Sequence, residues 1–153
     1  MDDALLYFED FQPGTRLELG TRTLERERII SFAREFDPQP FHIDEDAARD
    51  TMFGGIIASG WHTGSTLMRM LVDGLLLRSV TMGSPGVEEL KFLKPVYPNV
   101  ELAGFVRVES ARLSASRPGI GLVLLESTLV LPDGSVALLM RSWTMFGCRP
   151  AVQ

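Results

Sequence analysis

The sequence predicts an α+β protein in which a curved antiparallel sheet wraps around one long central helix. An apolar run from Ser59 to Ser79 is hydrophobic on nearly all sides, as expected of a buried helix. Segments of strand length with alternating polar and apolar residues follow it. Pro132, Asp133 and Gly134 form a turn signal between the last two segments. The 153 residues are expected to form a single domain, residues 1–153.

The N-terminal third predicts a turn, a strand and a helix. Residues 8–14 end in Pro-Gly, a turn signal, and residues 15–23 have the character of a first strand. A helix is expected to begin at Thr23, whose side chain can cap it, and to end near Phe36 or Asp37. The helix should end there because proline disfavours the α conformation of the residue before it, and Pro38 follows Asp37. A short helix over residues 44–49, with Asp44 as its cap, should come next.

The second half of the chain predicts the sheet. Strands are expected at residues 87–93, 100–110, 121–131 and 135–145. The alternation is clearest in the second of these, where Leu102 and Val106 share one face and Glu101 and Arg107 the other. The order of the strands favours a meander, in which each strand pairs with the one before it.

Residues 37–44 carry candidate chemistry. Asp37 and His42 are five residues apart, which on one helix separates them by roughly 140°. Fully extended, five residues would separate them by roughly 17 Å. Joint chemistry therefore needs a folded-back loop, and two prolines favour one because they fix φ. A carboxylate and an imidazole that share one water could act as an acid/base pair. The alternative is that Asp37 caps a helix end and His42 is a polar loop residue.

Small residues lead into the central helix. A helix start has unpaired N–H groups and partial positive charge, and small side chains let a ligand oxygen approach them. Ser59 and Gly60 could in this way stabilise an enolate oxygen formed from a thioester. The alternative is that the glycines permit tight packing of the helix on the sheet. His62, in the first turn, is expected to be a packing or capping residue, and Trp61 and Met68 core or interface residues.

Composition excludes several classes of protein. A net charge of −5 argues against general binding of nucleic acid. Cys148 is the only cysteine, so no internal disulfide can form, and the two histidines lack the spacing of a zinc site. The acidic start Met1-Asp2-Asp3-Ala4 does not resemble a signal peptide, and charges interrupt the longest apolar run. We therefore expect a cytoplasmic protein that does not span a membrane.

Residues 37–44, Asp-Pro-Gln-Pro-Phe-His-Ile-Asp, and residues 53–60, Phe-Gly-Gly-Ile-Ile-Ala-Ser-Gly, resemble the MaoC-like dehydratases. This family includes the (R)-specific enoyl-CoA hydratases of the hot-dog fold, and the likeness covers nearly the whole chain. Gln39 stands where asparagine is usual and Phe36 where glycine is common. The resemblance implies the hot-dog fold and at least a homodimer whose sheets join edge to edge, with the acyl pocket near the subunit boundary.

The residues and the resemblance together predict reversible addition of water to a trans-2-enoyl thioester of coenzyme A or an acyl carrier protein, giving an (R)-3-hydroxyacyl thioester. Asp37 and His42 are the predicted catalytic residues, and Gln39, Ser59 and Gly60 the predicted substrate-binding residues. No metal or other cofactor is expected, because the carbonyl makes the alkene electrophilic and the chemistry is proton transfer. Two alternatives remain: a hot-dog acyl-CoA thioesterase, and a non-catalytic subunit that binds acyl thioesters.

Overall fold

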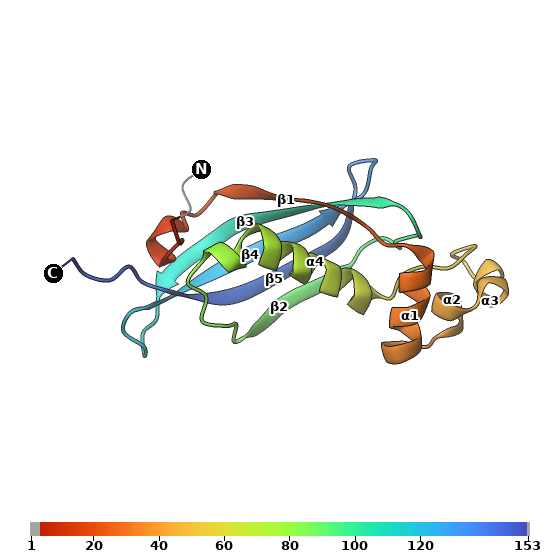
Figure 1. Cartoon of the computed structure of the whole chain (residues 1–153), viewed down its shortest axis with the longest axis horizontal. Helices are drawn as coiled ribbons and strands as arrows, with labels where there is room; N and C mark the ends of the chain where they lie inside the picture. The colour runs from red at the N-terminus through yellow and green to blue at the C-terminus, as the bar shows by residue number, and fades with distance from the viewer. Residues whose placement is uncertain (1–3, 153) are drawn as a thin grey trace.

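The computed structural model describes residues 4–152, so most of the acidic start used above, Met1 to Asp3, lies outside it. It confirms the α+β architecture: a curved antiparallel sheet of five strands wraps around one helix, α4 (Figure 1). The strands are β1 Arg16–Thr23, β2 Gly86–Phe92, β3 Glu101–Leu113, β4 Ile120–Val130 and β5 Val136–Gly147. The α-helices are α1 Arg26–Phe36, α2 Pro40–Ile43, α3 Glu45–Arg49 and α4 Gly60–Gly74, and the 3-10 helices are η1 Phe8–Asp10 and η2 Leu76–Arg78.

The predicted meander is wrong for one strand. The order across the sheet is β1-β3-β4-β5-β2, so only β3, β4 and β5 form a meander. Strand β2 pairs with β5 instead of β3, with Leu90 opposite Met140. The segment between β2 and β3 contains Pro95 and Pro98, which cannot donate ladder hydrogen bonds and suit a crossing connection. As a result, β1 and β2 are the two edges of the sheet.

The central helix is shorter and less evenly buried than predicted. It ends at Gly74 and gives way to η2, whereas the apolar pattern predicted helix as far as Ser79. Glycine suits this point because a Cβ there would lie 2.9 Å from the Leu19 side chain. Trp61 and Met68 are exposed, so one face of α4 is apolar but uncovered in the single chain.

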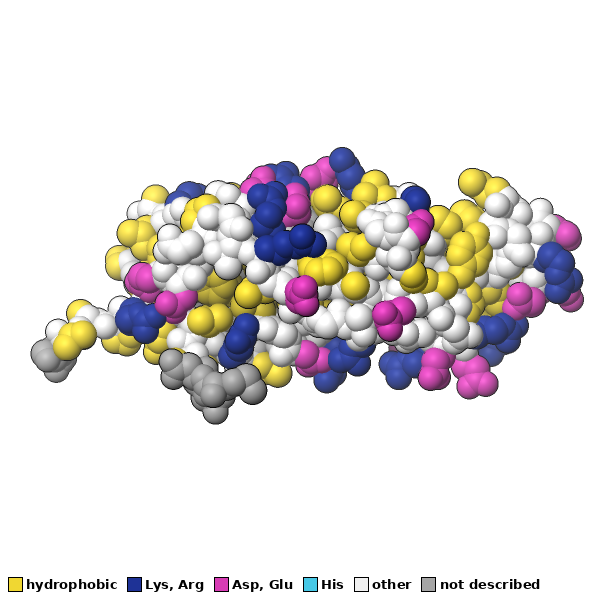
Figure 2. Space-filling view, turned by 90° about the horizontal axis from the view of Figure 1, so that it is seen from above, with side chains coloured by type: hydrophobic (Ala, Val, Ile, Leu, Met, Phe, Trp, Pro, Cys, Tyr) yellow, Lys and Arg dark blue, Asp and Glu magenta, His cyan; other side chains and the backbone are white. Residues whose placement is uncertain are grey.

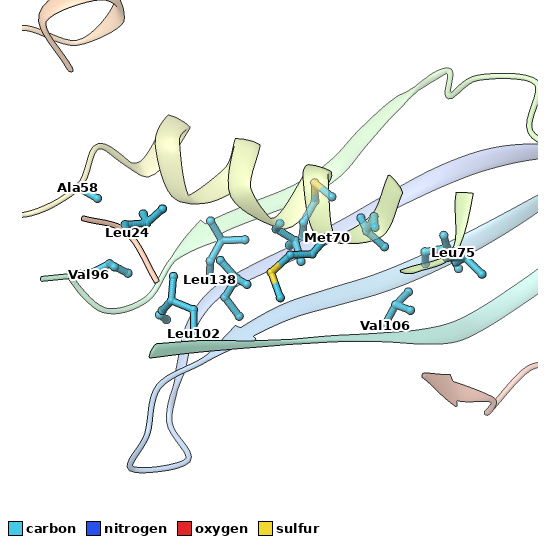
Figure 3. Close-up of a cluster of buried hydrophobic side chains, with 14 of the residues drawn as sticks. Leu24, Ala58, Met70, Leu75, Val96, Leu102, Val106 and Leu138 are labelled. Atoms are coloured by element: carbon cyan, nitrogen blue, oxygen red, sulfur yellow. The ribbon is translucent and has the colours of Figure 1, made fainter. Parts of the chain in front are cut away.

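The core lies between α4 and the concave face of the sheet (Figure 3). Leu67 and Met70 project from the helix and are almost completely buried. Leu102 and Val106 of β3 and Leu138 of β5 meet them from the sheet, which confirms the predicted inward face of β3. Burying side chains of this size stabilises the fold by about 1.5–3 kcal/mol each, so this contact positions the helix.

Helix capping follows the prediction at one place and departs from it at another. Asp44 caps α3 as predicted: its carboxylate accepts hydrogen bonds from the N–H groups of Asp46 and Ala47. Helix α1 begins at Arg26 instead of Thr23, because the strand before it continues to Thr23. Its N-cap residue is Glu25, whose side chain makes no capping hydrogen bond.

Helices α1, α2 and α3 gather at the end of the sheet where α4 begins, and both chain ends lie toward the opposite end (Figure 1). Basic, acidic and hydrophobic side chains are interspersed on the face above β1, and neither histidine is visible there (Figure 2). No helix formed by residues 4–152 combines the length and hydropathy needed to cross a lipid bilayer.

Candidate active site

Asp37 ends helix α1 as the proline after it predicted. Its backbone N–H donates to the carbonyl of Ala33, and its φ and ψ of −152° and 67° leave the helical region. The chain then folds back through two backbone hydrogen bonds, from Gln39 N–H to Asp37 O (2.8 Å) and from His42 N–H to Gln39 O (2.9 Å). Pro40 opens the single turn of α2, where its fixed φ suits a helix start. This turn returns His42 toward Asp37.

The two candidate catalytic side chains touch. His42 Nε2 lies 3.2 Å from Asp37 Oδ2, and both side chains are largely buried, with 6% and 18% of their surface exposed. The sequence predicted a pair that shares one water, whereas the structure places the imidazole and the carboxylate in direct contact. A distance of 3.2 Å is at the long end of the range for N–H···O hydrogen bonds.

The other ring nitrogen of His42 is held by a backbone carbonyl. His42 Nδ1 lies 2.6 Å from the carbonyl oxygen of Ile57. A carbonyl oxygen only accepts, so Nδ1 carries the hydrogen. A bare Nε2 facing the Asp37 carboxylate would place two lone pairs against each other. A hydrogen on Nε2 would donate to Asp37 Oδ2 and make this contact a charge-assisted hydrogen bond.

Three side chains donate to the Asp37 carboxylate. Gln39 Nε2 donates to Oδ1 (2.7 Å), Ser59 Oγ donates to Oδ2 (2.7 Å), and His42 contributes the third contact. Partial burial raises the pKa of Asp37, but the hydrogen bonds from Gln39 and Ser59 and the charge of His42 outweigh it. The pKa of Asp37 is therefore lower than that of an ordinary aspartate, and the carboxylate form is favoured.

Ser59 joins this pair to the start of α4. Its Oγ accepts a hydrogen bond from Trp61 N–H (3.3 Å), so the same hydroxyl caps the helix and donates to Asp37. Gly60 N–H, at the first helical position, has no acceptor among residues 4–152. This N–H is available to a ligand oxygen at the positive end of a 15-residue helix.

A cavity of about 330 Å³ opens beside these groups. His42, Gly60 and Thr63 contribute polar atoms, while Asp37 is not part of its wall, so His42 is the member of the pair that faces the cavity. The rest of the lining is mostly apolar and consists of Phe53, Ile57, Ala58, Phe92, Leu93, Lys94, Pro95, Val96 and Ala137. A cavity of this size and lining suits an apolar chain with one polar end.

Sequence reasoning missed the wall formed by β2 and β5. Phe92 is the last residue of β2 and Ala137 the second residue of β5, and they reach the cavity because these strands are paired. No local motif marks either residue, and a meander would have separated the two strands. A Cβ on Gly60 would lie 2.6 Å from the Phe92 ring, so this aromatic side chain also sets how close anything comes to the helix start.

The remaining candidates lie elsewhere. His62 is buried and stacks on Phe32 with ring centroids 4.5 Å apart, in keeping with the packing residue that was predicted. Among the described residues, no group of three or more His, Cys, Asp and Glu side chains could hold a metal ion. Burial raises the pKa of the Cys148 thiol, with the charge of Glu9 adding to the effect.

Comparisons with solved structures support the fold and the family. A MaoC-like dehydratase from Rhodospirillum rubrum is 37% identical and superimposes with a TM-score of 0.87, covering 95% of this chain and 99% of that one. The (R)-hydratase PhaJ1 from Pseudomonas aeruginosa is 19% identical with a TM-score of 0.76, covering 97% of this chain and 96% of that one. At that identity the second likeness shows the hot-dog fold alone.

Sequence relatives agree. An uncharacterised protein of Bacillus subtilis, YdeM, is 31% identical over 119 residues, which are 78% of this chain and 84% of that protein. Protein MaoC of Klebsiella aerogenes is 36% identical over 93 residues, which are 60% of this chain and only 27% of that larger protein. The family model for the MaoC-like domain matches residues 10–121. The chain therefore belongs to the MaoC-like domain family of hydratases and dehydratases.

Proposed function

We propose that this protein adds water reversibly to the 2,3 double bond of a trans-2-enoyl thioester, with coenzyme A as the expected carrier, and gives an (R)-3-hydroxyacyl product. The observation that carries the proposal is the contact between Asp37 and His42, with His42 Nδ1 held by the Ile57 carbonyl beside a mostly apolar cavity. The configuration of the product rests on the family and on the (R)-hydratase neighbours.

The proposed steps balance in protons. The Asp37 carboxylate takes a proton from water while the water oxygen bonds to carbon 3 of the substrate. Gly60 N–H donates to the thioester oxygen, and this hydrogen bond and the start of α4 stabilise the negative charge that develops there. His42 Nε2–H then gives its proton to carbon 2. The proton on Asp37 passes to Nε2 across their 3.2 Å contact, which restores the starting pair.

Gln39 and Ser59 have supporting parts in this proposal. Both donate to Asp37, so they favour the charged carboxylate and hold it in the orientation that meets water. Ser59 also ties that orientation to the helix start where the thioester oxygen would lie. No metal or other cofactor enters these steps, and the expectation that the protein needs none stays a prediction. A cytoplasmic location also stays a prediction.

A second copy of the chain is the proposed partner. Strand β2 is an edge of the sheet, and an unpaired edge tends to pair with another strand. Val87 and Phe92 on β2 and Trp61 on the adjacent helix start are all more than half exposed. Phe92 and Trp61 are also in contact, with ring centroids 6.1 Å apart. Pairing along β2 would cover this apolar surface and close the cavity from its open side.

An assay of crotonyl-CoA hydration tests the proposal. The reaction is monitored by the loss of the conjugated enoyl-thioester absorbance, and chiral analysis gives the configuration of the product. Removing a positioned acid/base group typically lowers the rate 10²–10⁴-fold, and we expect a loss of this size for Asp37→Asn and His42→Ala with the fold intact. Full turnover by both variants would rule out the pair. Release of free thiol from acyl-CoA without hydration would indicate a thioesterase, and binding without either reaction a non-catalytic subunit.

A further inference from the structure

A second cavity lies on another side of α4, between that helix and the start of α1. Its volume is about 450 Å³, and it shares no lining residue with the cavity beside His42. The lining consists of Arg22, Thr23, Leu24, Glu25, Arg28, Phe32, His62, Ser65, Thr66 and Arg69. Successive helical residues are roughly 100° apart, so Gly60 and Thr63 face the first cavity while His62 and Arg69 face this one. We call it the α1–α4 pocket.

Three arginines from three elements line the α1–α4 pocket. Arg22 comes from β1, Arg28 from α1 and Arg69 from α4. Asp73 binds both Arg22 (2.7 Å) and Arg69 (2.9 Å), which fixes these two side chains and leaves several of their N–H groups free. Arg28 forms no ion pair within residues 4–152. Glu25 is the one carboxylate among the lining residues, so the wall is basic in a chain of net charge −5.

The start of α1 adds unpaired donors to the same wall. Glu25, the N-cap residue, makes no side-chain capping bond, so first-turn N–H groups of this 11-residue helix lack the side-chain acceptor that usually caps them. The start of a helix favours an anion because these N–H groups and the helix dipole act together. A capping hydrogen bond to the Thr23 side chain, as predicted, would have paired one of these N–H groups, and the start of α1 has no side-chain capping bond.

His62 lies at the buried side of the same wall. Its side chain is more than nine-tenths buried, yet Nδ1 has no hydrogen-bond partner among the described residues. A buried polar atom without a partner is costly, and such atoms in native proteins call for an explanation. Burial and the charge of Arg28 both lower the pKa of His62, so the neutral ring with one N–H donor is favoured.

We propose that the α1–α4 pocket binds a phosphoryl anion, held by Arg28, Arg22 and Arg69 and by the start of α1, with His62 at its buried side. Ser65 and Thr66 contribute little, because their hydroxyls already donate to the carbonyls of Trp61 and His62. Planar guanidinium groups match phosphate oxygens in pairs, which favours a phosphoryl group over a carboxylate where three of them meet. The anion is either a phosphate of the thioester's nucleotide carrier or a separate phosphorylated molecule, and the first of these rests on the proposed function.

Inorganic pyrophosphate is a direct probe, and the two histidines report on the two cavities. We expect saturable binding by calorimetry, with a shift of the His62 imidazole signals in NMR spectra and none for His42. Losing one charge-assisted contact to a phosphate should weaken binding about ten- to hundred-fold in Arg28→Gln. Arg34→Gln is the matched control, because Arg34 lies on the same helix and outside the pocket. No saturable binding, equal affinity in Arg28→Gln, or a shift of His42 alone would overturn the proposal.

Kinetics then identify the source of the phosphoryl group. If the carrier's nucleotide occupies the pocket, Arg28→Gln should raise KM about tenfold for crotonyl-CoA and leave crotonyl-pantetheine unchanged. Loss of pyrophosphate binding with no change for either substrate supports a separate phosphorylated ligand. If the protein hydrates neither substrate, the proposed function fails while the pyrophosphate result still decides the anion site.

Discussion

Replacing Gln39 by alanine tests how the Asp37 carboxylate is kept charged. Gln39 Nε2 donates to Asp37 Oδ1 at 2.7 Å, and little else of the glutamine is used, since the residue is exposed. A hydrogen bond to a charged group contributes about 1.5–3 kcal/mol, and the lower figure suits a bond at the protein surface. If that contribution is realised in the transition state, kcat/KM for crotonyl-CoA should fall about tenfold.

The pH dependence separates this role from simple packing. Gln39 is one of the donors that lower the pKa of Asp37, so its removal should raise that pKa. The acid limb of the kcat/KM profile should then move to higher pH, because Asp37 must be charged to accept a proton from water. A group with a lowered pKa stabilises the fold above its unfolded pKa and loses this contribution as pH falls through the folded value. The difference in unfolding free energy between the wild-type protein and Gln39→Ala should therefore be present at neutral pH and become smaller in acid.

Gln12→Ala is the matched control for this experiment. Gln12 also uses its amide for one hydrogen bond, to the Glu9 carbonyl, but far from Asp37 in the chain and outside the cavity. It should leave the acid limb in place. An acid limb that does not move in Gln39→Ala, or that moves to lower pH, would refute the assignment of Gln39 as a positioning residue for the Asp37 charge.

Two further predictions concern assembly and stability. Val87→Lys places a charge on the exposed β2 edge and should shift analytical ultracentrifugation profiles from dimer toward monomer. The control, Leu113→Lys at the end of β3, should leave the profile unchanged. A dimer in both variants would contradict pairing along β2. Asp44→Ala removes the cap of α3 and should lower the unfolding free energy by about 1 kcal/mol in urea titrations. The control, Asp46→Ala at an exposed position, should lower it by less than about 0.5 kcal/mol. Equal losses in the two variants would argue against capping by Asp44.

The fold was predictable where local pattern decides structure and not where distant pairing does. The long apolar run, the alternation of residues 100–110 and the Pro-Asp-Gly turn each depend on neighbours in the chain, and each led to the observed element. The position of β2 depends on whether it pairs with β3 or with β5, and the residues of β2 are compatible with both. The end of α4 depends on the Leu19 side chain against Gly74, a contact from another strand.

The candidate site shows the same division. Two prolines within residues 37–40 favoured the fold-back that joint chemistry of Asp37 and His42 would need, and the structure contains this fold-back. Their direct contact could not be predicted, because it requires the Ile57 carbonyl to hold the ring and Ser59 to hold the carboxylate. The catalytic and substrate-binding roles of these residues stay predictions that the kinetic experiments test.

Gly60 is where two explanations of one glycine can be separated. The sequence suggested a small residue that lets a ligand oxygen approach the helix start, or one that permits close packing. The structure adds a specific packing partner, since a Cβ on Gly60 would lie 2.6–2.7 Å from three atoms of the Phe92 ring. Overpacking typically costs 1–3 kcal/mol, and the half-exposed ring can turn aside, so we expect Gly60→Ala to destabilise by about 1 kcal/mol.

The same substitution in a Phe92→Ala background should be nearly neutral for stability, which gives a coupling energy of about 1 kcal/mol in urea titrations. Additive effects would show that the ring is not what requires a glycine. Hydration kinetics on the same four proteins address the ligand. If Gly60→Ala lowers kcat/KM only when Phe92 is present, the glycine serves the aromatic wall of the cavity. If it lowers kcat/KM equally in both backgrounds, the methyl group itself obstructs the substrate, as expected where Gly60 N–H donates a hydrogen bond to the thioester oxygen.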